Sequence, residues 1–165
     1  MDIITALAVI IGVMGGVATW GAVTLGSAFV LIWAIFIGWG SFFHCGGKEE
    51  GLQKAIAGSV WGAICATVAL IALTSIGVTP VTAGLCVGIT VLVMILGAKL
   101  PLLSAIPAAV YGYAATAGLF LLAGAGYGEG AGGIIKVAVA IAVSLVIGVI
   151  LGYISEKIAG AVAKA

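Results

Sequence analysis

Long apolar runs separated by short polar or glycine-rich stretches make up most of this 165-residue chain. The runs cover residues 3–23, 25–43, 55–75, 80–98, 102–124 and 134–155, each close to the length of about 20 residues at which a helix crosses a bilayer. The connection WGAVTLG between the first two runs is short and uncharged, and Gly21 and Gly26 indicate a break there. The pattern therefore predicts six transmembrane helices.

Composition supports a membrane-embedded chain. Hydrophobic residues make up 64% of the sequence and charged residues 7%, which is too little charge to cover a water-soluble domain. The six basic residues are all lysines and nearly balance five acidic ones, so the chain has no basic surface for nucleic acid. We predict an all-α integral membrane protein that forms one transmembrane domain over residues 1–165, with the lipid bilayer as its surroundings.

The lysines predict the orientation of the chain. With a cytoplasmic N-terminus, five lysines lie on the cytoplasmic side and Lys136 lies outside, which satisfies the positive-inside rule. The five are Lys48, Lys54, Lys99, Lys157 and Lys164. Both termini are expected in the cytoplasm, with residues 156–165 as a cytoplasmic tail.

Two stretches of the chain resemble each other. IWAIFIGWGSFF at 32–43 returns as IPAAVYGYAATA at 106–117, and each copy has a glycine followed by an aromatic residue, Gly38-Trp39 and Gly112-Tyr113. A three-helix unit that is repeated must insert its second copy upside down, as many transporters do. We therefore predict inverted halves at 1–75 and 80–155, with the middle helix of each half at their centre.

Gly-x-x-x-Gly patterns indicate close helix packing. Gly12–Gly16 and Gly84–Gly88 occupy corresponding places in the two halves, whereas Gly58–Gly62 and Gly148–Gly152 do not align. Because these faces exceed what one bundle needs, we expect a homo-oligomer in which Gly12, Gly16, Gly148 and Gly152 contact a neighbouring copy.

Small residues form one stripe on each middle helix, and the stripe has two interpretations. It serves close helix packing, or it lines a narrow passage where the two helices cross. For the second interpretation the candidate lining residues are Ala34, Gly38, Trp39, Ser41, Ser104, Pro107, Ala108, Tyr111, Gly112, Tyr113 and Thr116.

Pro107 marks an irregularity in the fifth helix, because proline has no N–H to donate to the carbonyl one turn earlier. One interpretation is an ordinary proline kink. The other is a break, with PLLSAI as a re-entrant or kinked lead-in and the regular helix starting near Pro107.

Ionisable residues are missing from the middle of every run, although proton-coupled carriers and ion pumps usually need one there. His44 and Cys45 stand together, but a metal site needs three or four ligands and no CxxC or HxxxH accompanies them. His44 is better interpreted as interfacial packing or as a residue at the mouth of a pore. With no nucleotide-binding loop or catalytic triad pattern, we expect no enzyme activity, no cofactor and no metal.

Several of these features together resemble the YcdZ-type family of small bacterial inner-membrane proteins, a domain of unknown function. The resemblance rests on WGAVTLG, FIGWGSFFHCGG, GLQK, GSVWGAICA and GAKLPLLSAIPAAVYGYAATAG, within residues 15 to 120. It implies a location in the bacterial cytoplasmic membrane, and it implies no substrate.

Three functions fit the sequence. One is a channel or facilitator for a small, mostly uncharged solute such as urea, a short amide, ammonia or a small alcohol. A second is a secondary transporter of an organic solute that holds its coupling ions with backbone carbonyls. The third is a scaffold or accessory subunit with a sealed core.

Cysteine labelling tests the predicted topology. A membrane-impermeant maleimide is expected to label Glu129→Cys from outside and Glu50→Cys only from the cytoplasmic side, because the loops after the middle helices of inverted halves face opposite sides. Labelling of both positions from the same side contradicts the inverted repeat.

Overall fold

The computed structural model describes residues 1–26 and 30–164, and over these residues the chain forms six α-helices. They are α1 (Ile3–Leu25), α2 (Ile32–His44), α3 (Lys48–Ile76), α4 (Pro80–Leu96), α5 (Ile106–Ala123) and α6 (Gly130–Lys164). Short 3₁₀ helices, η1 (Gly97–Lys99), η2 (Pro101–Leu103) and η3 (Gly124–Tyr127), flank α5. The all-α prediction is confirmed.

Five of the helices in the described part of the chain are long and apolar enough to cross a bilayer, and α2 is the short one. Its 13 residues rise about 20 Å, less than the hydrocarbon thickness of about 30 Å. The amide of Leu31, which precedes α2, donates to Ser144 Oγ of α6 at 2.9 Å. That bond gives a partner to a backbone amide at the start of α2, where the helix itself offers no carbonyl.

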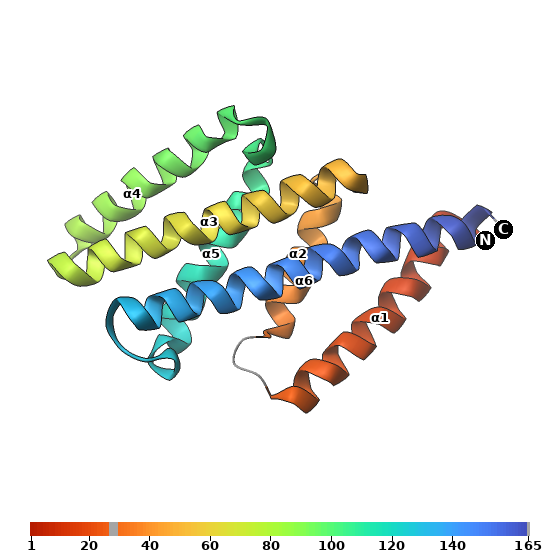
Figure 1. The fold of residues 1–165 in the computed structure, drawn as a ribbon, viewed down its shortest axis with the longest axis horizontal. Helices are drawn as coiled ribbons and strands as arrows, with labels where there is room; N and C mark the ends of the chain where they lie inside the picture. The colour runs from red at the N-terminus through yellow and green to blue at the C-terminus, as the bar shows by residue number, and fades with distance from the viewer. Residues whose placement is uncertain (27–29, 165) are drawn as a thin grey trace.

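The helices form a layered bundle (Figure 1). The two longest, α3 and α6, run side by side, and α2 and α5 lie together on one side of them. Helix α2 packs mainly on α6 and α5 mainly on α3, while α1 flanks α6 and α4 flanks α3. Both chain termini lie at the same end of the bundle, which we call the terminal side.

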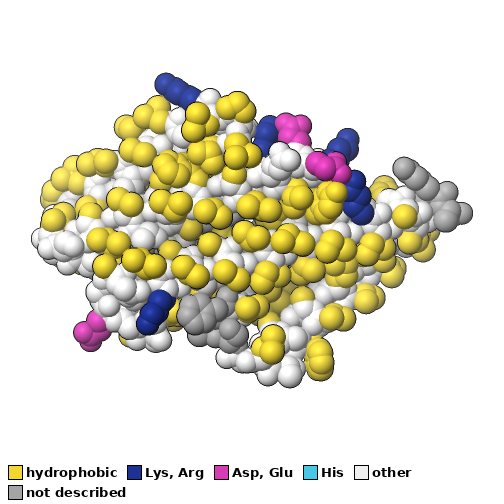
Figure 2. Space-filling model, viewed as in Figure 1, with side chains coloured by type: hydrophobic (Ala, Val, Ile, Leu, Met, Phe, Trp, Pro, Cys, Tyr) yellow, Lys and Arg dark blue, Asp and Glu magenta, His cyan; other side chains and the backbone are white. Residues whose placement is uncertain are grey.

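Charge lies at the margins of this bundle. Figure 2 shows the charged side chains gathered at two opposite edges of the visible face, with a broad hydrophobic surface between them. On the terminal side Glu49 of α3 pairs with Lys157 of α6 at 2.7 Å and accepts a hydrogen bond from Tyr153 at 2.9 Å. The start of α3 therefore meets the end of α6, and the two helices are antiparallel.

The helix contacts of the two halves correspond when α1, α2 and α3 are matched with α4, α5 and α6. The contact of α2 with α6 then corresponds to the contact of α5 with α3. Gly38 of α2 lies against the carbonyl of Leu145 in α6, and Gly112 of α5 lies in the same way against the carbonyl of Ser59 in α3. A Cβ at either glycine would overlap that carbonyl oxygen. The resemblance between 32–43 and 106–117 therefore corresponds to a repeated contact.

The glycines of α3 and α6 complete this contact from the other side. Gly62 lies against the carbonyl of Ala109 in α5, and Gly148 lies against the carbonyl of Ile35 in α2. Gly62 and Gly148 are thus equivalent, although the Gly-x-x-x-Gly patterns that contain them are offset. Tertiary packing decides this equivalence because only one glycine of each pattern meets the middle helix in the same way.

The glycine patterns fall into an inner and an outer group. Gly58 packs against Ala108, and Gly152 packs against Phe42. The Gly-x-x-x-Gly patterns of α3 and α6 therefore face other helices of the same bundle. The expectation that Gly148 and Gly152 contact a neighbouring copy is corrected to internal packing. On α1 and α4, no described atom lies within 4 Å of the Cβ position at the four remaining glycines, Gly12, Gly16, Gly84 and Gly88.

Several boundaries differ from the predicted ones. Gly26 ends α1 in the left-handed conformation (φ 56°), as the predicted break requires, whereas Gly21 lies within the helix. Helices α3 and α6 extend beyond 55–75 and 134–155, because hydropathy does not detect helical turns outside the membrane. Pairs such as Glu50–Lys54, four residues apart at 2.6 Å, support those turns.

At Pro107 the structure shows a break rather than a kink. Helix α5 begins at Ile106, so Pro107 occupies its first turn, where the missing N–H costs little. The preceding residues form η1 and η2 instead of extending the helix.

Substitution of the inner glycines is expected to destabilise the fold. Gly148→Leu would overlap the Ile35 carbonyl and lower the free energy of unfolding by about 1–3 kcal/mol. Gly12→Leu, with the same change in helix propensity but open space around it, is expected to stay within about 0.5 kcal/mol. Thermal or denaturant unfolding in detergent measures both, and equal effects would contradict the assigned packing.

Candidate functional site

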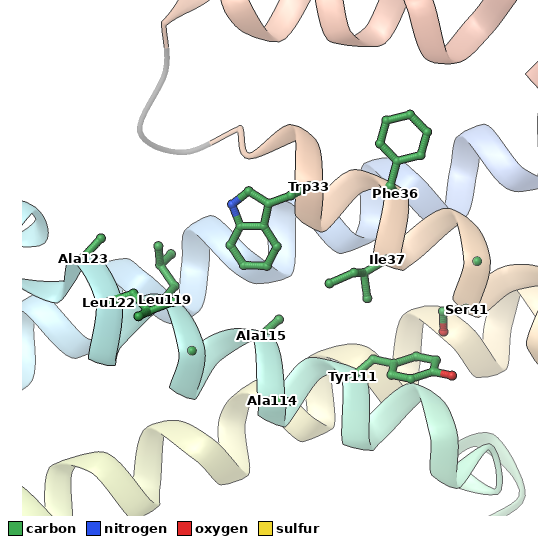
Figure 3. Close-up of a pocket in the computed structure, with 12 residues that line it drawn as sticks. Trp33, Phe36, Ile37, Ser41, Tyr111, Ala114, Ala115, Leu119, Leu122 and Ala123 are labelled. Atoms are coloured by element: carbon green, nitrogen blue, oxygen red, sulfur yellow. The ribbon is translucent and has the colours of Figure 1, made fainter. Parts of the chain in front are cut away.

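A groove of about 880 Å³ separates α2 from α5, the two equivalent middle helices (Figure 3). All of its described lining residues belong to these two helices, and none of them is charged: Trp33, Phe36, Ile37, Gly40, Ser41, Tyr111, Ala114, Ala115, Gly118, Leu119, Leu122 and Ala123. In Figure 3, α3 and α6 lie behind the groove. Its walls are therefore two helices, and its open side is the face away from α3 and α6.

Ser41 is the polar residue inside the groove. Its side chain is fully buried, and its Oγ makes no hydrogen bond of good geometry to a described residue, although it interacts weakly with the Cys45 thiol. Figure 3 shows Ser41 and Tyr111 at the same end of the groove. A buried hydroxyl without a partner costs about 1–3 kcal/mol, so a molecule in the groove that hydrogen-bonds to Ser41 offsets that cost.

The Cys45 thiol lies just after α2, one turn beyond Ser41. Burial raises the pKa of this thiol, and the Ser41 hydroxyl and Lys54 oppose the increase only in part. The thiol therefore stays protonated at neutral pH, and a neutral thiol is a weak hydrogen-bonding partner for Ser41.

A hydrogen bond closes the groove at the terminal side. His44 Nδ1 in the last turn of α2 lies 2.8 Å from the Tyr111 hydroxyl of α5, and their ring centroids are 5.9 Å apart. His44 is exposed and Tyr111 is half-buried, so the pair stands at the boundary between groove and surroundings. The role of His44 at the mouth of a pore stays a prediction.

The structure divides the predicted lining residues into three groups. Ser41 and Tyr111 line the groove. Ser104 is exposed and Pro107 half-buried at the start of α5. The others are buried between helices: Ala34, Gly38, Trp39, Ala108, Gly112, Tyr113 and Thr116.

The buried group has packing partners of its own. Trp39 Nε1 donates to Ser155 Oγ at 3.0 Å, and the Tyr113 hydroxyl pairs with Thr90 Oγ1 at 2.9 Å. Thr116 Oγ1 donates to the Gly112 carbonyl within α5 at 2.8 Å. The groove lies on another face of α2 and α5, away from the contacts of Gly38 and Gly112 with α6 and α3.

Sequence reasoning missed most of the aromatic and aliphatic lining of the groove. Trp33, Ile37 and Gly40 follow helical spacing on α2, as do Ala114, Gly118 and Leu122 on α5. That spacing marks a face of each helix, but it does not show that the two faces meet at a groove.

The described residues contain no group of three His, Cys, Asp or Glu side chains placed to hold a metal ion. His44 pairs with Tyr111, while Cys65 and Cys86 lie within α3 and α4 as thiols. The polar chemistry of the groove is therefore that of hydroxyl groups and one imidazole.

Comparison with known proteins places the chain in a family. Residues 8–160 match the family described as "Protein of unknown function (DUF1097)". The chain is also 32% identical over 124 residues to the protein named "Inner membrane protein YcdZ" of Salmonella typhimurium (strain LT2), over 70% of this chain and 71% of that protein. No solved structure matches it. The resemblance to YcdZ-type proteins is confirmed, and the chain belongs to the DUF1097 family of unknown function.

Proposed function

We propose that this membrane protein is a facilitator for a small, mostly uncharged polar solute of the urea, short amide, ammonia or small alcohol class, with the groove between α2 and α5 as its path. The observation that carries the proposal is Ser41, a buried hydroxyl among the groove's lining residues whose one weak interaction among the described residues is with the Cys45 thiol. A solute with one donor or acceptor satisfies that hydroxyl as it passes.

The lining favours uncharged solutes. Its described residues carry no charge. Moving a charged solute from water into these apolar surroundings therefore costs desolvation free energy, and no oppositely charged side chain in the groove offsets it. Ser41 and Tyr111 offer hydrogen bonds at one end, and aromatic and aliphatic side chains occupy the rest. This arrangement suits a molecule that is small and weakly polar.

Large apolar side chains are exposed on the open side of the groove. Trp33 and Phe36 are 42% and 46% exposed, and Leu122 is 89% exposed. In the proposed assembly a second copy of the chain covers this side and completes the passage, so the protein works as a homo-oligomer. The terminal side faces the cytoplasm of the bacterial cell in this proposal, as the lysines predict.

Flux into proteoliposomes tests the function. We expect the protein to pass urea, acetamide, ammonia or glycerol in both directions without a Na⁺ or H⁺ gradient. Ser41→Ala is expected to lower the rate roughly 2–10-fold, because it removes one hydrogen bond to the solute.

Ser59→Ala is the matched control, because Ser59 Oγ is also buried without a described partner but lies on α3, outside the groove. This variant is expected to keep the parental rate. Flux that requires an ion gradient would instead indicate a secondary transporter, and absence of flux for the whole panel would favour a scaffold.

Cross-linking tests the second copy. In a background with the three native cysteines replaced, Leu122→Cys is expected to form a cross-linked dimer in membranes, since it borders the open side of the groove. Val81→Cys on α4, also well exposed, serves as the comparison. Dimers at Val81 and none at Leu122 would place the contact between copies elsewhere.

A further inference from the structure

The repeat assigns a counterpart to each residue that closes the groove. The offset of 74 positions that relates Gly38 to Gly112 also relates the residues preceding the two helices, Leu31 and Ala105. Applied to the closing pair, it relates His44 to Gly118 and Tyr111 to Ile37. Both counterparts line the groove, so the pair Ile37–Gly118 is the equivalent of the pair His44–Tyr111.

The two equivalent pairs are in different states. His44 Nδ1 and the Tyr111 hydroxyl are 2.8 Å apart, which closes the terminal side. At Gly118 no described atom lies within 4 Å of the Cβ position, so nothing packs where His44 makes its contact in the other half. The groove is closed at one pair and open at the other.

We propose that the His44–Tyr111 hydrogen bond is a gate, and that the protein alternates between this conformation and a second one in which the bond is broken and α2 and α5 close at Ile37–Gly118, midway along the groove. The inference rests on the proposed function, since it concerns how the same groove passes a solute. In an inverted repeat, exchanging the conformations of the two halves moves the opening from one side of the membrane to the other.

The position of this bond distinguishes it from the hydrogen bonds that hold the bundle together. Trp39 and Ser155 meet in a buried, packed interface between α2 and α6. The His44–Tyr111 bond is exposed and joins the two helices that the groove separates. A single exposed hydrogen bond competes with water and opens readily. Ser41 lies between the two pairs along α2, and its side chain is fully buried in the conformation with the His44–Tyr111 bond formed.

Reversible cross-linking tests the gate in the full chain reconstituted in liposomes. Two double variants, His44→Cys/Tyr111→Cys and Ile37→Cys/Gly118→Cys, are made with Cys45, Cys65 and Cys86 replaced by alanine. A short bifunctional methanethiosulfonate is expected to link each pair and to reduce urea or acetamide flux at least about tenfold, and reductant is expected to restore it. Glu49→Cys/Lys157→Cys is the control, because it links α3 to α6 outside the groove and leaves flux unchanged.

Two results would overturn the gate. One is unchanged flux after the His44→Cys/Tyr111→Cys pair is linked; the other is failure of the Ile37→Cys/Gly118→Cys pair to link, since the second conformation brings it together. Gly118→Leu provides a test without cross-linking, because its side chain enters open space midway along the groove and is expected to block the groove there and stop flux. If the parental protein conducts, either of these two results refutes the gate but not the proposed function. If the parental protein shows no flux, the proposed function itself is refuted.

Discussion

Glycine-to-carbonyl contact between helices is the constraint on which this fold depends. Without side chains at Gly38 and Gly148, α2 approaches α6 until each glycine meets a backbone carbonyl, and Gly112 and Gly62 do the same for α5 and α3. In a bilayer, lipid is as apolar as the side chains, so close backbone packing replaces the hydrophobic effect as the source of association. Because this contact uses one face of α2 and of α5, another face of each is left to form the groove.

The same close packing determines which serine and threonine hydroxyls find a hydrogen-bond partner. Most serine and threonine hydroxyls return to a carbonyl of their own helix, and Ser144 also accepts from the amide that precedes α2. Ser41 and Ser59 are the buried hydroxyls without a partner in the described part of the chain. Of these two, only Ser41 lines the groove, at the end where Tyr111 bonds to His44. The Ser41 hydroxyl thus lies next to the His44–Tyr111 hydrogen bond. In the proposed function, a solute bound at Ser41 leaves when that bond breaks.

Local features of the sequence predicted the fold well where backbone chemistry decides the outcome. Gly26 ends α1 and Pro80 starts α4, as predicted, whereas at Pro107 the sequence left both a kink and a break open and the structure places this residue in the first turn of α5. The lengths of α3 and α6 were underestimated, because the first turns of α3 and the last turns of α6 leave the apolar stretch while remaining helical. Gly38 and Gly112 were recognised as a pair, but the expectation that they meet at a crossing of the middle helices was wrong. Each packs on the third helix of the other half, Gly38 on α6 and Gly112 on α3.

By itself, the sequence determined the membrane class, the number of helices and the equivalence of the two middle segments, since apolar length and the glycine-aromatic pairs are properties of neighbouring residues. Only the tertiary structure decided which face of α2 and α5 is buried and which lines the groove. Helical spacing separates the faces of a helix by angle, but the partner of each face comes from elsewhere in the chain. His44 and Tyr111 are 67 positions apart, and their contact exists only because α6 and α3 hold α2 and α5 at the separation that the glycines permit.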